Sequence, residues 1–89
     1  MDAVSSRPMF GGLGLYQRET FFGIIFQDRL FFKTDESTRK DYEKCGMEPF
    51  RPNEKQTLKN YYEVPVDVFE NREKLVGWAE KAIRVARAR

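Results

Sequence analysis

Three short runs of aromatic and β-branched residues follow one another between Met9 and Lys33, and they restrict the fold more than any other feature of the sequence. The runs cover residues 9–16, 21–26 and 29–33. Such residues favour the pleated surface of a sheet. The polar breaks between the runs are only a few residues long, which suits antiparallel hairpins. The sequence therefore predicts three consecutive antiparallel strands, the first of them rich in glycine.

A short helix and a fourth strand are predicted next. Asp35 is placed to cap the start of the helix, and Gly46 is placed to end it in the left-handed conformation. Prolines in the segment 49–52 favour an extended chain, and residues 56–64 have the composition of a strand.

The last segment predicts an amphipathic helix from a cap at Asn71 to about Arg87, preceded by one helical turn with a capping box at Asp67 and Glu70. One stripe of this helix is apolar at the spacing of a buried face, with Trp78 as its largest anchor. The stripe consists of Leu75, Trp78, Ala79, Ala82, Ile83 and Ala86. The predicted order is βββ-α-β-α, and the fold class is α+β: a two-layer antiparallel sheet with helices on one face.

Composition limits the classes of function. Eighty-nine residues form one domain, 1–89, and we expect residues 1–8 to be poorly ordered. Cys45 is the only cysteine and histidine is absent, which removes an intramolecular disulfide and the commonest general base and metal ligand. No run of residues resembles a signal peptide or a membrane helix, so we expect a cytoplasmic protein without membrane contact.

Several blocks of sequence resemble the N-terminal domain of the TfoX/Sxy regulators of competence. The blocks that carry the resemblance are Met9-Phe10-Gly11-Gly12-Leu13-Gly14-Leu15-Tyr16, Asp28 to Asp35, Tyr42-Glu43 with Gly46 and Pro49-Phe50, Tyr61-Tyr62-Glu63-Val64-Pro65, and Leu75 with Trp78-Ala79. They come in the order of the family and cover residues 9–86.

The resemblance implies a secretion-chaperone-like α+β domain related to regulators of DNA uptake. We therefore expect a stand-alone, non-enzymatic module that regulates transcription or binds a protein partner. The motif residues are expected to be structural: Met9, Phe10, Gly11, Gly12, Gly14, Tyr16, Tyr61, Tyr62, Pro65 and Trp78.

No catalytic, cofactor-binding or metal site is expected. The glycines at 11–14 could cradle a phosphate, but such loops open a helix, whereas strand-forming residues continue here to Tyr16. Cys45 could be a reactive thiol, although with no histidine as base we favour a buried or inert cysteine. Four acids could bind a cation, but their spacing favours a solvated face. These acids are Glu36, Asp41, Glu43 and Glu48.

The alternative function is nucleic-acid binding by the basic end of the last helix. Residues 71–89 carry six Lys or Arg against two acids, a net +4 that leaves −2 for residues 1–70. The candidate contacts are Lys81, Arg84, Arg87 and Arg89. Cations at this end also compensate the helix dipole, and this second interpretation is favoured. DNA is therefore a partner that we do not expect to be bound strongly.

The protein partner is expected to include a second copy of the chain. The family usually opens with a helix before Met-Phe-Gly-Gly, and the eight residues before Met9 include Pro8. Neighbouring rings in Phe21-Phe22 and Phe31-Phe32 point to opposite faces of the sheet, so both faces carry aromatic rings. Without that helix some rings would lack cover within the chain, which predicts a homodimer.

Overall fold

The computed structural model describes residues 3–9 and 11–88. Within these residues the chain forms six strands and three helices. The strands are β1 (Val4–Met9), β2 (Gly12–Gln17), β3 (Thr20–Phe26), β4 (Arg29–Lys33), β5 (Pro49–Asn53) and β6 (Gln56–Glu63). The helices are α1 (Glu36–Lys44), α2 (Val66–Phe69) and α3 (Arg72–Arg87).

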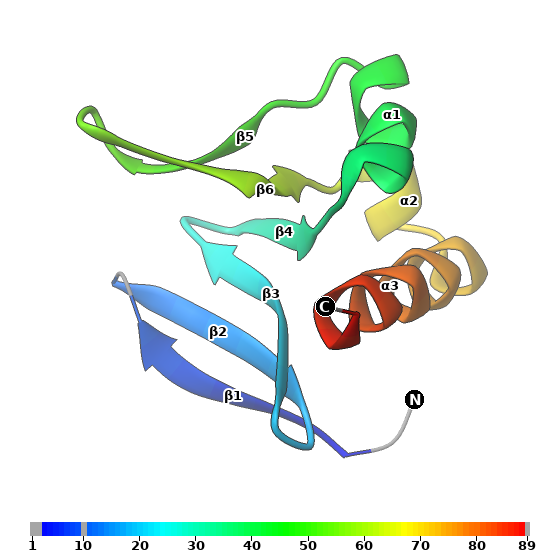
Figure 1. Cartoon of the computed structure of the whole chain (residues 1–89), viewed down its shortest axis with the longest axis horizontal. Helices are drawn as coiled ribbons and strands as arrows, with labels where there is room; N and C mark the ends of the chain where they lie inside the picture. The colour runs from blue at the N-terminus through cyan, green and yellow to red at the C-terminus, as the bar shows by residue number, and fades with distance from the viewer. Residues whose placement is uncertain (1–2, 10, 89) are drawn as a thin grey trace.

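These strands form a single sheet in the order β1-β2-β3-β4-β6-β5, with every neighbouring pair antiparallel. The helices lie together on one side of the sheet (Figure 1). The predicted α+β class, with an antiparallel sheet and helices on one face, is therefore confirmed. The strands predicted at 21–26, 29–33 and 56–64 correspond to β3, β4 and β6 to within one residue.

The start of the chain differs from the prediction. We expected poor order before Met9, but Val4–Met9 forms β1 and pairs with β2 along its whole length. The predicted first strand is divided by a turn at Gly11, whose φ of +77° is in the left-handed region that favours glycine. The side chains of residues 4–8 are exposed, so no alternation of polar and apolar residues revealed the strand.

The two edges of the sheet are β1 and β5, and each carries proline: Pro8 in β1, and Pro49 and Pro52 in β5. Proline lacks the backbone N–H that a ladder needs and is accordingly found at sheet edges. The extended stretch predicted from the prolines at 49–52 is thus a strand, one that the predicted order βββ-α-β-α omitted.

A β-bulge in β3 determines which aromatic rings face the helices. Leu15 pairs with Gly23 and Tyr16 pairs with Phe21, which leaves Phe22 as one extra residue. Phe22 packs in the core under the helices, whereas the ring of Phe21 lies 5.2 Å from that of Tyr16 on the other face. The prediction that neighbouring phenylalanine rings point to opposite faces of the sheet is confirmed for this pair.

The core on the helix side joins all three helices to the sheet. The rings of Trp78 in α3 and Tyr42 in α1 meet edge-on with centroids 4.7 Å apart. Trp78 is therefore an anchor of the last helix, as predicted. The buried residues of this core are Phe22, Leu30, Phe32, Tyr42, Tyr62, Val64, Val68, Ala79, Ala82 and Ile83.

The other face of the sheet is covered by the chain itself. Phe50 in β5 is 0% exposed, and its ring centroid lies 4.7 Å from that of Phe31 and 5.3 Å from that of Phe26. Phe26 is in β3, three strands away, and a flat sheet would separate the two backbones by roughly 14 Å. The sheet therefore curls, and the β5–β6 hairpin folds over this face. The expectation that its aromatic rings lack cover was wrong.

Two of the three predicted helix starts are confirmed. The carboxylate of Asp35 accepts a hydrogen bond from the backbone N–H of Thr38 at 2.9 Å, which with other hydrogen bonds lowers the pKa of Asp35. Asn71 accepts in the same way from the N–H of Lys74 at 3.1 Å. The capping box predicted for the helical turn before α3 is wrong, because α2 begins after Pro65, which has no capping side chain.

Candidate functional site

The glycine motif lies in a β-hairpin. A β-carbon at Gly12 would collide with the backbone carbonyl of Ile25, and one at Gly14 would lie 2.8 Å from the sulfur of Met9. The glycines therefore allow neighbouring strands to approach closely. Since Gly12 begins β2 rather than a helix, the motif lacks the helix N-terminus of a phosphate-binding loop. Phe10 lies outside the described residues.

Tyr61 and Tyr62 both belong to the core, on opposite faces. Tyr62 packs under the helices, and its ring centroid lies 6.1 Å from that of Tyr42. Tyr61 packs on the other face, with its ring centroid 5.4 Å from that of Phe21. Burial raises the pKa of Tyr61 to about 12 and that of Tyr42 further. Both tyrosines of the motif are therefore buried.

Two cations lie over rings on the face away from the helices. The guanidinium carbon of Arg7 is 4.6 Å from the centroid of Tyr16, and Nζ of Lys33 is 5.0 Å from that of Tyr61. At these distances the cations contact the ring faces and shield them from other ligands. Among the remaining motif residues, Pro65 is buried where α2 begins.

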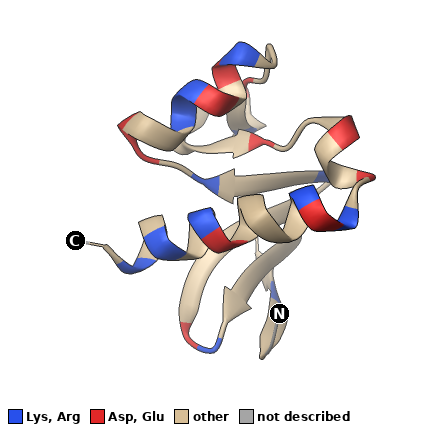
Figure 2. Cartoon of the chain, turned by 90° about the vertical axis from the view of Figure 1, so that its right-hand side faces the viewer, with Lys and Arg blue, Asp and Glu red and all other residues tan. Residues whose placement is uncertain are grey.

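The basic end of α3 is only partly a free surface. Nζ of Lys81 lies 3.9 Å from a carboxylate oxygen of Asp41, and Nη2 of Arg87 donates to Oε1 of Gln17 at 2.7 Å. Acidic and basic residues alternate along the N-terminal half of α3, and the cations gather toward its C-terminal end (Figure 2). Arg84 is exposed, and Arg89 lies outside the described residues.

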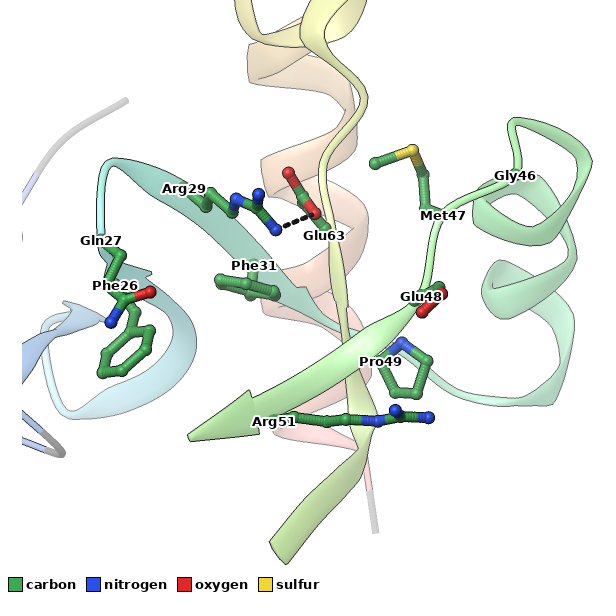
Figure 3. Close-up of a pocket in the computed structure, with 10 residues that line it drawn as sticks. All are labelled: Phe26, Gln27, Arg29, Phe31, Gly46, Met47, Glu48, Pro49, Arg51 and Glu63. Carbon is green, nitrogen blue, oxygen red and sulfur yellow. Dashed lines mark ion pairs between the residues drawn. The ribbon is translucent and has the colours of Figure 1, made fainter. Parts of the chain in front are cut away.

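A cleft of about 380 Å³ lies between the β3–β4 turn and the start of β5 (Figure 3). Its polar groups include Arg29, Arg51, Glu48 and Glu63. Nη1 of Arg29 lies 3.6 Å from Oε1 of Glu63, so two of the opposite charges already face each other. The cleft thus presents charges of both signs, and its ion pair contributes little energy because the side chain of Arg29 is largely exposed.

Cys45 and the four acids are surface groups. We expected a buried or inert cysteine; Cys45 is exposed at the end of α1, so the expectation of burial is wrong, and that of an inert thiol stays a prediction. The carboxylates of Glu36, Glu43 and Glu48 belong to exposed residues, and Asp41 faces Lys81. Within residues 3–9 and 11–88, His, Cys, Asp and Glu form no group of three or more suited to a metal ion.

A groove lined entirely by apolar side chains runs beside α3 on the helix side. Its volume is about 260 Å³, and α2, α3, β2, β3 and β4 contribute to it. The groove lies beside α3, which packs mainly against β3 and β4. We call it the helix-side groove. Its lining includes Leu15, Ile25, Phe69, Leu75 and Val76.

Large apolar side chains around this groove are exposed to solvent. Leu13 and Ile25 are opposite one another in the β2–β3 ladder and are 38% and 37% exposed. On α2, Val66 is 67% and Phe69 52% exposed. These residues were not predicted from the sequence, although one signal was present. The segment of α2 contains three apolar residues in one turn, and only Val68 of these faces the core.

Comparisons with known proteins agree with the resemblance drawn from the motifs. The sequence matches the family of TfoX N-terminal domains over residues 1–86. It is also 30% identical over 70 residues to DNA transformation protein TfoX1 of Aliivibrio fischeri, a match that covers 76% of this chain and 33% of that protein. The chain thus spans about a third of that relative's length. No helix within the described residues is long and apolar enough to cross a membrane. Because the family match extends over nearly the whole sequence, the chain belongs to the family of TfoX N-terminal domains.

Proposed function

We propose that the chain is a non-enzymatic domain that acts by contacting another protein, in the regulation of DNA uptake. The observation that carries this proposal is the helix-side groove, an apolar recess with the half-exposed ring of Phe69 at its rim. Contiguous apolar surface of this kind on a small domain is typical of a protein-binding site. The relative's name, a DNA transformation protein, supports the biological process.

The assignment of a non-enzymatic role is supported by composition and by the cleft. The sequence contains no histidine, the side chain that most often serves as a general base. In the cleft near Arg29, the carboxylate of Glu63 is occupied by an ion pair. The groove, in contrast, is apolar throughout, which suits the burial of a partner's side chains rather than chemistry.

A domain exchange tests the proposal. The matching segment of TfoX1 is replaced by this chain in A. fischeri, and the frequency of DNA transformation is measured. We expect the chimera to restore transformation, and the same chimera with Phe69→Asp to lose it, because a charge in the groove opposes burial. Thr57→Asp in β6, at an exposed position outside the groove lining, is the charge-matched control.

The chimera would contradict the proposal if it were expressed and folded but unable to support transformation. Equal activity of the Phe69→Asp and Thr57→Asp chimeras would show that the groove has no part in the function. Immunoblots and thermal melts of each purified domain separate these outcomes from a failure to fold.

The alternative function is nucleic-acid binding by α3, but two basic residues of α3 already contact side chains within the domain. Lys81 and Arg87 already have partners in Asp41 and Gln17. Phosphate contacts would give an affinity for DNA that falls steeply with salt. We expect only weak binding at physiological salt. Tight, strongly salt-dependent binding that Arg84→Ala and Arg87→Ala abolish would favour the alternative instead.

A further inference from the structure

We infer that the helix-side groove is the interface of a symmetric pair of copies of this chain, in which Phe69 of each copy enters the groove of the other. The inference rests on the proposed function, contact with another protein, and identifies that protein as a second copy of the chain. It follows from the position, the size and the shape of the exposed apolar surface.

The second face of the sheet is closed by the β5–β6 hairpin, with Phe50 fully buried, so it offers no large apolar surface among the residues that the structure describes. On the helix side, α3 packs mainly against β3 and β4, and α1 packs against β6. Leu13 and Ile25, which lie next to the groove on β2 and β3, remain more than one-third exposed. Uncovered apolar surface is therefore concentrated on one side of the molecule.

The size of this surface fits a small dimer. Leu13, Ile25, Val66 and Phe69 expose between 37% and 67% of their surface. Together they present on the order of 350 Å², which lies within the range of about 300–600 Å² found for the largest apolar patch on a typical monomer, a patch that is often functional. A standard interface buries about 800 Å² per partner, of which somewhat more than half is apolar. The patch thus supplies most of the apolar area that one side of such an interface needs.

The shape of the surface favours a second copy as the occupant. A two-fold interface requires that one patch contain both the protruding group and the recess that receives it. Phe69 and Val66 are the most exposed apolar side chains of the patch, on the short helix α2. The recess, of about 260 Å³, is lined by Phe69 on α2 and also by Ile25 and Leu15 on the sheet. Two copies related by a two-fold axis can therefore exchange phenylalanines.

A charge-pair rescue tests this arrangement. Phe69→Lys and Ile25→Asp are each expected to weaken self-association by at least about thirtyfold, because each removes a central apolar contact. When the two variants are mixed, the introduced lysine of one copy meets the introduced aspartate of the other. The second contact, between the native Phe69 and the native Ile25, is unchanged. Dimers should therefore form again. Sedimentation velocity from the micromolar to the millimolar range measures all three samples, with Thr57→Asp as control.

Three results would overturn the inference. The first is a wild-type chain that sediments as a monomer at hundreds of micromolar. The second is unchanged dimerisation of the Phe69→Lys and Ile25→Asp variants. The third is a mixture that stays monomeric although each variant alone is folded by circular dichroism. If the chain is monomeric but Phe69→Asp still abolishes transformation in the chimera, the groove receives a different protein, and only the proposed function survives.

Discussion

Replacing Phe50 by alanine is expected to destabilise the domain severely, because this side chain closes the second face of the sheet. Phe50 is completely buried, and its ring contacts those of Phe26 and Phe31. Truncation of a buried phenylalanine to alanine costs about 3–5 kcal/mol. Total stabilities are about 5–15 kcal/mol, and a domain of this size has a thin core. Phe50→Ala should therefore lose a large share of its free energy of unfolding.

Urea denaturation followed by tryptophan fluorescence measures the loss, since Trp78 lies in the core on the other face. Phe50→Leu separates volume from ring contacts. Leucine keeps most of the buried apolar volume but makes no aromatic contacts. The free energy of unfolding of Phe50→Leu should therefore fall by only roughly 1–2 kcal/mol, because of the small change in volume and the lost ring contacts. Val4→Ala, at a 45% exposed position of β1, is a control expected to change stability by less than about 0.5 kcal/mol.

The measurement is made below micromolar concentration, in order to minimise self-association through the helix-side groove. An unfolding midpoint of Phe50→Ala equal to that of Val4→Ala would refute the closure of this face by the β5–β6 hairpin.

Further predictions concern backbone conformation and ionisation. Gly23→Ala should lower the melting temperature, because the added β-carbon would lie 2.9 Å from the backbone oxygen of Phe31. At Gly77 in α3 an added β-carbon meets open space. Gly77→Ala should therefore raise the free energy of unfolding by about 0.5–1 kcal/mol in urea denaturation. Asp28→Gly should raise the melting temperature, since Asp28 has a φ of +64° in a hairpin turn that favours glycine. Burial holds the pKa of Tyr61 at about 12 and raises that of Tyr42, so the folded state retains these protons more tightly than the unfolded state. The contribution of these two tyrosines to stability should therefore be constant up to about pH 10 and fall above it. Tyr61→Phe should reduce this fall in urea titrations across that range. A pH dependence in Tyr61→Phe identical to wild type would show that this burial is wrong.

Local signals made much of the fold predictable from the sequence. The strand Arg29–Lys33 has the predicted bounds because strong strand formers lie between a polar turn and the cap at Asp35. The start of α3 at Asn71 was predictable for the same reason, since a capping side chain acts within one turn. These features depend on residues close together in the sequence.

What the sequence did not reveal depends on distant pairing. The strand β1 is held by backbone hydrogen bonds to β2 and has exposed side chains, so it leaves no hydrophobic pattern. The bulge at Phe22 depends on how β2 and β3 are aligned with each other, and the sequence of one strand alone does not determine that alignment. The groove could not be predicted because its walls come from segments far apart in the sequence, such as those of Ile25 and Phe69.

The prolines at both rims of the sheet limit how copies of this domain can associate. A strand from a neighbouring molecule would have to dock beside Pro8 on one rim, or beside Pro49 and Pro52 on the other, where backbone donors are missing. Sideways growth into a continuous ribbon is thereby disfavoured. Contact through a face ends once that face is occupied, so the protein is expected to form discrete particles at high concentration rather than fibrils.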